Sequence, residues 1–329
     1  MKKQGNASGV SAFPADIVLP DGSLNGKWAL RSEVLYRGMN GQAVERFYMS
    51  ASPQSYIFKP LTNSGQWGQE KWVYENVLPA FPPLYPKMLA ESADPDTGRH
   101  WIIFEDIGNL HHMFSEAAAL KLVESVAWWH ALPTDRWTEF PLKGPKPQVE
   151  EMAAELLRNE PGMKQLLAKL SVAVPEAIWE LIRDILEREP SSTTPRVLCH
   201  GDLHLGNYAQ VDGRIVVLDW EHAHLSSPYW DLYHIIDMSH PSFPKTVTSS
   251  VRTGILLAYR EQSRSFAHRS ESEEEFIRGY AQFACVFSLW MLSLIAGDLA
   301  RGAAKWPQEQ LERQLQEAMA SLNQCAELL

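Results

Sequence analysis

Two carboxylates and one amide in the second half of the chain could together hold a metal ion: Asp202, Asn207 and Asp219. Their oxygen atoms suit a hard divalent cation such as Mg²⁺, which keeps some waters and takes further ligands from phosphate. If two of the three groups hold the metal, one acid remains to act as a base. These residue types therefore predict metal-assisted chemistry on a phosphate compound.

A hairpin is needed to bring Asp219 back to the other two residues. Asp212-Gly213 is a strong signal for a two-residue turn, and strand-like runs flank it at 208–211 and 214–218. The returning strand ends at Asp219, beside the loop from which the hairpin starts. We therefore expect the three oxygen-bearing side chains to converge.

The same segment resembles the catalytic part of a kinase. The sequence HGD at 200–202, followed by Asn207, matches the H-x-D-x-x-x-x-N loop, and DWE at 219–221 stands where protein kinases have Asp-Phe-Gly. The HGD and DWE forms are similar to those of the aminoglycoside phosphotransferase and choline kinase family of small-molecule kinases. Pro228 and the Asp-Leu pair at 231–232 extend the resemblance, because that family follows its DWE with Pro-x-x-Asp-Leu.

This resemblance implies a fold class and an activity. The fold would be a bilobal, protein-kinase-like α+β fold with a small antiparallel-sheet N-lobe and a large, mostly helical C-lobe. The activity would be transfer of the γ-phosphate of ATP or GTP to a hydroxyl of a small molecule. Asp202 would accept or orient the hydroxyl proton, while Asn207 and Asp219 would hold Mg²⁺. His200 would brace the catalytic loop by hydrogen bonding, and Asp231 would brace it from the following helix.

The two lobes divide the expected roles. The first lobe would span residues 1–105 and bind the nucleotide, with roughly the first 24 residues partly a tail. The second lobe would span residues 106–329 and carry the catalytic residues and the acceptor.

Two glycines lie in the turn between the first two expected strands, at 28–36 and 43–50. Glycine allows backbone N–H groups to approach a phosphate closely. For Gly38 and Gly41 an ordinary hairpin turn is the simpler explanation. The resemblance would place both glycines over the nucleotide phosphates.

A lysine among apolar residues, Lys59, ends the third expected strand and is followed by helical periodicity. In the resembled family such a lysine contacts the α and β phosphates and pairs with a glutamate of the next helix. Glu70 is the predicted partner, because Glu70 and Tyr74 fit the family's Glu-x-x-x-Tyr on one helix face. Glu75 is the alternative partner. The simplest interpretation is that Lys59 is a surface lysine at the end of a strand.

An apolar strand at 101–104 runs into a short polar connector that we interpret as the hinge between the lobes. In the resembled family the hinge backbone meets the purine base, which implicates Glu105 to Ile107. We expect the side chains of Glu105 and Asp106 to be exposed and without a catalytic role.

The remainder of the chain is expected to be helical. If the resemblance holds, the helices between 150 and 188 would determine which acceptor binds. Glu221 and the aromatic Trp220, Tyr229 and Trp230 lie near the motif and could hold a cationic acceptor such as an amino alcohol or aminoglycoside, although core packing explains such aromatics as well. The expected helices cover 118–130, 150–158, 175–188, 233–238, 249–260, 273–293 and 308–328.

Composition limits the partners and the compartment. The net charge is −10, which argues against a broad nucleic-acid surface or a patch for anionic membranes, and allows either an acidic cleft or simple solubility. Three widely spaced cysteines, Cys199, Cys285 and Cys325, indicate a reducing compartment without disulfides. The N-terminus lacks the apolar core of a secretory signal, so we expect a cytoplasmic protein.

One apolar run, 279–297, approaches the length of a membrane-spanning helix. Gln282, Ser288 and Ser293 interrupt it, so a helix buried in the large lobe is the preferred interpretation. We therefore expect no membrane partner.

Three alternatives remain at this point. The histidines near the motif could suggest zinc, but they lack C-x-x-C or H-E-x-x-H spacing. A catalytically silent scaffold would be indicated by loss of Lys59, Asp202, Asn207 or Asp219, and all four are present. A protein kinase would need a long activation loop ending in Ala-Pro-Glu, which does not follow Asp219. The sequence leaves the oligomeric state open.

Overall fold

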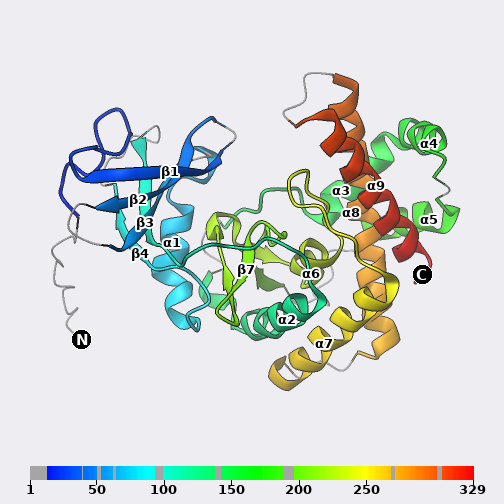
Figure 1. The fold of residues 1–329 in the computed structure, drawn as a ribbon. Coiled ribbons are helices and arrows are strands. Elements are labelled where there is room, and N and C mark those ends of the chain that lie inside the picture. Colours follow the sequence, from blue (N-terminus) through cyan, green and yellow to red (C-terminus); the bar gives the residue numbers. More distant parts are fainter. Residues whose placement is uncertain are drawn as a thin grey trace. The chain divides into compact units, whose positions relative to one another are not determined.

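The chain forms two compact units, Met1–Leu110 and His111–Leu329 (Figure 1). The assignment of the nucleotide to the first unit and of the acceptor to the second stays a prediction. The computed structural model describes residues 13–38, 40–49, 53–61, 64–92, 99–137, 142–172, 174–187, 196–267, 271–301 and 306–329.

The first unit is built on a five-stranded antiparallel sheet in the order β1-β2-β3-β5-β4. Consecutive strands pair with each other, with one exception. Strands β3 and β4 do not pair, because β5 lies between them. This is the small antiparallel sheet that the sequence predicted. The strands are β1 (Ala29–Arg37), β2 (Ala43–Met49), β3 (Ser55–Pro60), β4 (Met88–Glu91) and β5 (Trp101–Glu105).

Apolar side chains from three neighbouring strands form the core of the first unit. Phe47, Phe58 and Ile103 are buried on one face, and Phe13 and Ile17 pack against them. We expected the first residues to be partly a tail. From Phe13 onward this expectation is wrong, because these two side chains cover apolar surface of the sheet that water would otherwise contact.

A helix, α1 (Gln69–Asn76), follows the third strand. Helical periodicity at 66–78 predicted an earlier start, but Gly68 has φ 75°, a left-handed conformation that a right-handed helix does not contain. Val73 and Tyr74 are buried, and Glu70 lies in the first turn. The short 3₁₀ turns η1 (Ser64–Gln66) and η2 (Leu78–Ala80) flank the helix.

The second unit is mostly helical, as predicted. One helix, α4, was not among the predicted helices, and it contains Pro161 and Gly162 in its first turn. Proline is tolerated in the first turn of a helix, where its missing N–H would have no intrahelical partner. The helices are α2 (Glu116–His130), α3 (Val149–Arg158), α4 (Glu160–Lys169), α5 (Glu176–Glu187), α6 (Tyr229–Ile236), α7 (Ser249–Ala267), α8 (Glu273–Arg301) and α9 (Gln308–Ala326), with 3₁₀ turns η4 (Asp135–Trp137) and η5 (Trp220–His222).

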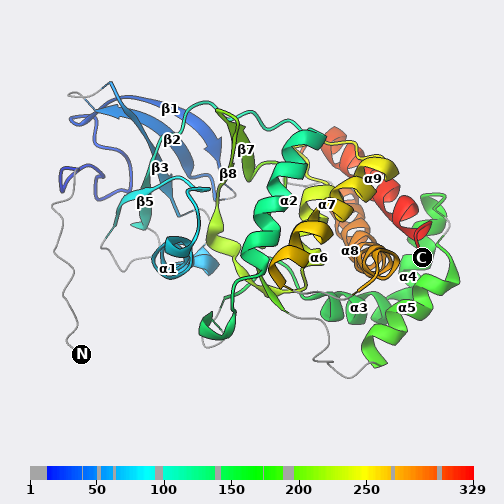
Figure 2. The same cartoon turned by 90° about the horizontal axis from the view of Figure 1, so that it is seen from below.

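Two short antiparallel strand pairs lie among these helices. The hairpin of β7 (Tyr208–Val211) and β8 (Arg214–Val217), seen in Figure 2, is the predicted one. Asp212 and Gly213 have φ 49° and 79°, as the expected tight turn requires. The second pair, β6 (Val197–Cys199) with β9 (His224–Ser226), joins segments on either side of the hairpin and was not predicted.

Helix α8 is long and apolar enough, by length and composition alone, to cross a membrane. In its most apolar window 61% is buried inside the protein. Its polar groups also have partners in the core, since the Ser288 hydroxyl lies 3.0 Å from that of Tyr233 and the Tyr280 hydroxyl donates to Asp237. These are properties of a core helix, as the sequence predicted.

Helix α6 is held at its end by a buried ion pair. Asp237 follows the helix, and its Oδ1 lies 2.6 Å from Nη2 of Arg252 in α7, with both side chains almost fully buried. Removing one member of such a pair would leave an uncompensated buried charge. The pair therefore fixes the helix that carries Asp231 and His234.

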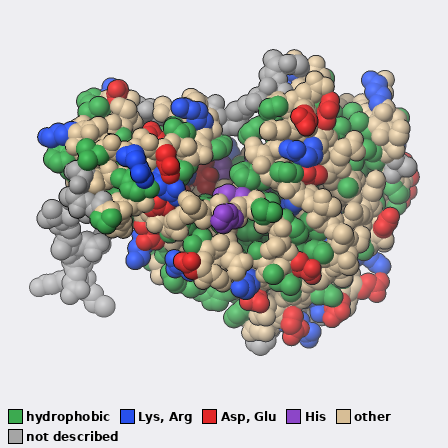
Figure 3. Space-filling view, viewed as in Figure 1, with side chains coloured by type: hydrophobic (Ala, Val, Ile, Leu, Met, Phe, Trp, Pro, Cys, Tyr) green, Lys and Arg blue, Asp and Glu red, His purple; other side chains and the backbone are tan. Residues whose placement is uncertain are grey.

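The face of the protein in Figure 3 carries interspersed acidic and basic side chains. No broad basic patch is seen on this face among the residues that the view colours, which agrees with the acidic net charge of −10.

Candidate active site

The catalytic loop begins at the end of β6 and is held from beneath by Asp231. The backbone N–H of His200 donates to Oδ2 of Asp231 at 2.9 Å, and that of Gly201 donates to Oδ1 at 3.2 Å. The indole of Trp230 donates to the Gly201 carbonyl at 2.8 Å. The predicted bracing role of Asp231 is confirmed.

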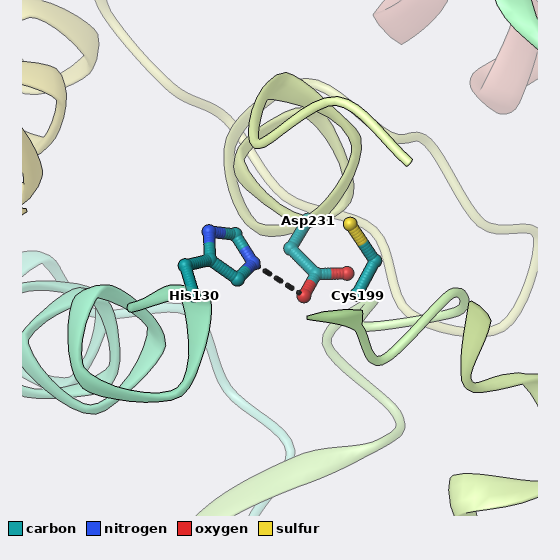
Figure 4. A group of neighbouring side chains, drawn as sticks. All are labelled: His130, Cys199 and Asp231. Carbon is teal, nitrogen blue, oxygen red and sulfur yellow. Dashed lines mark hydrogen bonds and ion pairs between the residues drawn. The ribbon is translucent and has the colours of Figure 1, made fainter. Parts of the chain in front are cut away.

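His130 at the end of α2 completes this support (Figure 4). Its Nε2 lies 3.2 Å from Oδ2 of Asp231, so this histidine packs beneath the loop. Burial alone would raise the pKa of Asp231, but hydrogen bonds from His130 and the loop outweigh it and lower the pKa to about 2. Asp231 is therefore a carboxylate at neutral pH.

Cys199 is the third side chain of Figure 4, and the three groups lie close enough to suggest a cation site. Burial raises the pKa of the Cys199 thiol well above its usual range, so the thiol keeps its proton, and it donates to the Ser227 carbonyl at 3.4 Å. Both Asp231 oxygens already accept backbone N–H groups. Hydrogen bonding accounts for this cluster without a metal.

The depressed pKa of Asp231 predicts a loss of stability in acid. Its folded pKa of about 2 lies below the unfolded value of 3.8, so the stabilisation is present above about pH 4 and is lost as the pH falls through the folded pKa. The shift is worth about 2 kcal/mol in the free energy of unfolding. Urea unfolding between pH 2.5 and 7 should show a shallower pH dependence for Asp231→Asn than for the wild type. Equal slopes for the two proteins would contradict this prediction. Asp184→Asn, at an exposed aspartate, is the control.

Position 201 requires a glycine, because the backbone of another segment lies too close to leave room for a side chain. The φ of Gly201 is 93°, and a Cβ there would lie 2.0 Å from the carbonyl oxygen of His222. A backbone atom cannot move aside as the end of a flexible side chain can. The loop and the segment after Asp219 can therefore pack together only with glycine here.

This packing predicts a specific stability difference. Gly201→Ala should destabilise the protein more than Gly213→Ala, because Gly213 also has positive φ, 79°, but its Cβ would meet nothing within 4 Å. The control carries only the conformational cost, roughly 1–2 kcal/mol. The overlap should add about 1–3 kcal/mol at Gly201. Chemical denaturation of both variants measures the difference, and equal losses would be inconsistent with the clash.

His200 is fully buried and braces the loop, as predicted. Its Nε2 donates to the carbonyl of Leu218 at 2.8 Å, and its Nδ1 accepts the backbone N–H of Asp202 at 3.3 Å. The ring therefore ties the start of the loop to the residue before Asp219. Because both ring nitrogens are engaged, the structure assigns it a positioning role.

Asn207 is oriented as a metal ligand would need to be. Its Nδ2 donates to the carbonyl of Asp202 at 2.8 Å, so Oδ1 is the atom that would face a cation. Its own carbonyl accepts the N–H of Leu218 at 2.8 Å, which places it across the hairpin from the residue before Asp219.

Asp219 follows β8 and has φ 61°, in the left-handed region. Aspartate tolerates this conformation better than most residues, and such backbone outliers gather at functional sites. Burial lowers the pKa of His222, and the charges of Asp202 and Asp219 both oppose that shift. Both carboxylates therefore act on the same ring, and the convergence of the Asp202 and Asp219 side chains stays a prediction. An amide oxygen with a carboxylate fits Mg²⁺ as a donor set.

Asp202 is surrounded by cationic and imidazole groups. Its Oδ1 lies 3.1 Å from Nζ of Lys146 and 3.8 Å from Nε2 of His234, and its Oδ2 lies 3.6 Å from Nε2 of His204. Burial alone would raise the pKa of Asp202, but Lys146 and the histidines hold it well below its usual range. Asp202 is therefore ionised and able to accept a hydrogen bond from a hydroxyl.

Lys146 is the neighbour that sequence reasoning missed. It lies between Pro145 and Pro147 in the loop before α3, where a lysine reads as part of a surface turn. No motif or periodicity connects it to Asp202.

In the first unit Lys59 pairs with Glu70. Nζ of Lys59 lies 2.7 Å from Oε2 of Glu70, and both side chains are largely buried. Glu75, the alternative, lies 3.8 Å from Lys71, which also forms an ion pair with Glu91. The predicted pair is therefore present, and its contact with nucleotide phosphates stays a prediction.

The two glycines of the first turn use their N–H groups within the turn. The N–H of Gly38 donates to the carbonyl of Gln42 at 2.8 Å, and that of Gly41 donates to the carbonyl of Gly38 at 3.0 Å. This is the hairpin role given above as the simpler explanation. A phosphate role for these groups would require them to leave their partners, and it stays a prediction.

The hinge side chains are not exposed, which corrects the expectation. Asp106 has a side chain only 4% exposed, and it accepts from Arg46 at 2.5 Å and from the Ser55 hydroxyl at 2.6 Å. The half-buried Glu105 accepts the N–H of Lys87, and its own N–H donates to the Lys87 carbonyl. The guanidinium of Arg46 compensates the negative charge of the buried Asp106. The sequence around Asp106 did not indicate this distant partner.

The aromatic residues near the motif belong to the core. Trp220 and Trp230 are fully buried, and Tyr229 packs against Phe276. Glu221 is also buried, with Oε1 3.4 Å from Nε2 of His222. The structure thus gives no support to an acceptor site formed by these aromatics.

Four predicted residues belong to the second unit: His200, Asp202, Asn207 and Asp219. Hydrogen bonds link the first three to one another and to Leu218, the residue before Asp219. The ion pair of Lys59, the turn glycines and the hinge from Glu105 to Ile107 belong to the first unit.

Comparison with known proteins follows this geometry. The profile of the phosphotransferase enzyme family matches residues 77–272. A search of curated protein sequences found no match.

Solved structures share the fold. Choline kinase from Cryptosporidium parvum Iowa II is 12% identical, with 95% of this chain and 93% of that chain covered and a TM-score of 0.58. Macrolide 2′-phosphotransferase MphH from Brachybacterium faecium is 17% identical, with coverage of 92% and 94% and a TM-score of 0.54. Spectinomycin phosphotransferase APH(9)-Ia, solved with ADP and spectinomycin, is 12% identical, with coverage of 91% and 93% and a TM-score of 0.55. These similarities confirm the predicted kinase-like α+β fold class.

Proposed function

Because this chain belongs to the phosphotransferase enzyme family, we propose that it transfers the γ-phosphate of ATP or GTP to a hydroxyl group of a small molecule. The observation that supports the proposal is that Asn207 ties the loop of an ionised Asp202 to the end of the β7–β8 hairpin: it donates to the Asp202 carbonyl and accepts the N–H of Leu218, the residue before Asp219. A base and two oxygen ligands are the groups that such a transfer needs from the protein.

Each residue would have a distinct role. Asp202 would accept or orient the proton of the attacking hydroxyl, and His200 would hold the loop in place. Asn207 through Oδ1 and Asp219 through its carboxylate would hold Mg²⁺, which when bound neutralises charge on the phosphates. Phosphoryl transfer has a loose transition state, so the protein contributes mainly alignment and electrostatic stabilisation.

The first unit would bind the nucleotide. Lys59, oriented by Glu70, would contact the α and β phosphates, and the hinge backbone between Glu105 and Ile107 would meet the base. The N–H of Glu105 is engaged with Lys87, so other hinge backbone groups would have to make that contact. The turn with Gly38 and Gly41 would lie over the phosphates.

The structural neighbours support this class of reaction. One neighbour is a choline kinase and another was solved with ADP and spectinomycin, so the fold accommodates nucleotides and small hydroxyl compounds. An amino alcohol or an aminoglycoside, the acceptor that the sequence suggests, is one class of acceptor to test. We further propose a cytoplasmic enzyme without a nucleic-acid or membrane partner.

A nucleotide-consumption screen tests the proposal. The full chain is incubated with Mg²⁺ and either ATP or GTP, and with single members of a panel of amino alcohols, aminoglycosides, sugars, nucleosides and hydroxy acids. We expect one acceptor class to stimulate consumption, and Asp202→Asn to remove that stimulation. Mg-dependent nucleotide binding without turnover of any acceptor would indicate a silent binding protein. Phosphorylation of a protein substrate alone would indicate a protein kinase.

A further inference from the structure

The loop before α3 is docked against strand β9, and this places one lysine beside Asp202 of the catalytic loop. Gly144 lies so close to the His224 ring that a Cβ would be 2.8 Å from it. At the other end, Gln148 accepts the Ser226 hydroxyl through Oε1 at 2.8 Å. Lys146 lies between these two contacts, so its backbone position is fixed on both sides.

The ammonium of Lys146 has two acceptors in the site. It donates to Oδ1 of Asp202 at 3.1 Å and lies 3.4 Å from Nε2 of His234. The Nδ1 of His234 donates to the carbonyl of Trp230 at 2.8 Å, which leaves Nε2 as an acceptor for the lysine. A lysine has three N–H donors, so the described contacts leave one for another group. Lys146 and Asp202 are 15% and 22% exposed at the side chain, so neither group is sealed from solvent.

The histidines around Asp202 are neutral at physiological pH. Burial lowers the pKa of His204 to about 4, that of His234 to about 3 and that of His240 to about 3. His204 and His240 stack with their ring centroids 4.4 Å apart, and Phe243 stacks on His204 at 5.7 Å. These rings therefore form an uncharged wall beside Asp202.

The remaining charges do not make the site attractive to a cation. Lys146 balances Asp202, and a bound divalent metal would balance Asp219. A second buried lysine, Lys245, donates to the carbonyl of His234 at 3.0 Å, and burial lowers its pKa to about 7, so it carries only part of a positive charge at neutral pH. Glu221 is buried beside His222, whose pKa burial lowers, and its carboxylate lies within 4.8 Å of that of Asp219, where a divalent metal would balance both acids. An ammonium group on the acceptor would have to approach Lys146 to bring its hydroxyl to Asp202, and like charges at that range repel.

We infer that Lys146 selects acceptors that carry a negatively charged group, a carboxylate or a phosphate, near the hydroxyl that is phosphorylated. A charge-assisted hydrogen bond to the third N–H of Lys146 would hold this group while the hydroxyl meets Asp202. The inference rests on the proposed function and replaces the cationic acceptor suggested by the sequence.

The test compares acceptors matched in size but different in charge. Glycerate, glycerol 3-phosphate, glycerol and ethanolamine form a small set, and gluconate, glucose 6-phosphate, glucose and glucosamine form a larger one. The wild type, Lys146→Met and Lys146→Arg are assayed for nucleotide consumption with Mg²⁺. The exposed Lys143→Met, from the same loop, is the control. Binding is also measured as the shift in Tm of the protein with Mg²⁺ and ADP, which does not require turnover.

We expect an anionic member of one set to be preferred, and Lys146→Met to raise its KM on the order of 10-fold or more. The KM of the neutral member should change much less, and Lys146→Arg should recover part of the loss. Comparing the carboxylate members with the phosphate members of each set shows which kind of anion the site prefers. A lysine that only keeps Asp202 ionised would lower kcat for all acceptors alike without altering the preference.

The outcomes separate this inference from the proposed function. Preferred turnover of a cationic member, or equal effects of Lys146→Met on all members, would overturn the inference while the kinase assignment stands. Lys146-dependent binding of an anion without phosphorylation of any acceptor would support the recognition and contradict the kinase assignment. The absence of both turnover and Lys146-dependent anion binding would overturn both.

Discussion

Replacing Asp202 with asparagine is expected to lower kcat on an identified acceptor by about 10²- to 10⁴-fold. The amide can still accept a hydrogen bond from Lys146, 3.1 Å away, but it cannot take the proton of the attacking hydroxyl. Binding of Mg·ATP should change little, because the proposed metal ligands are other residues. Steady-state kinetics and nucleotide titration measure the two effects.

Asp212→Asn is a matched control on the same hairpin. It makes the same chemical change at a residue with φ 49°, and Asn-Gly is as good a turn sequence as Asp-Gly. This variant should keep wild-type kinetics. If Asp202→Asn instead turned over an acceptor at a near-normal rate, Asp202 would not be the base.

Replacing Asp219 is expected to abolish turnover and also to weaken Mg·ATP binding. Loss of an outer-shell partner already costs about 10- to 100-fold in metal affinity, so loss of a ligand should cost at least as much. Asp219→Ala alone is ambiguous, because alanine is strained at φ 61°. Asp219→Asn tolerates that conformation and keeps one oxygen ligand without the charge.

The two variants should therefore differ in a graded way. Raising the Mg²⁺ concentration should restore part of the activity of Asp219→Asn and none of that of Asp219→Ala. Unfolding in urea checks that both variants remain folded. Unchanged Mg²⁺ dependence in both would exclude Asp219 as a metal ligand.

The proposed metal site could be predicted because its parts are close in sequence. Asp202, Asn207 and Asp219 lie on one loop and one hairpin, and the Asp212-Gly213 turn dictates the register that pairs Tyr208 with Val217. Residue types at set spacings then indicate the chemistry. The same holds for Glu70, since helical spacing left only two glutamates to choose between.

The sequence alone determined the kinase-like fold class, the catalytic loop and its likeness to a phosphotransferase family, because these depend on short-range patterns of polarity and turn residues. Only the tertiary structure decided which distant groups meet. Lys146 lies 56 residues before Asp202, and Arg46 lies 60 residues before Asp106. A lone lysine or aspartate has no periodicity that marks its partner, so packing decides whether its charge faces water or a buried counter-charge. The charge of the acceptor site therefore follows from how a loop is docked, which no local pattern in this chain records.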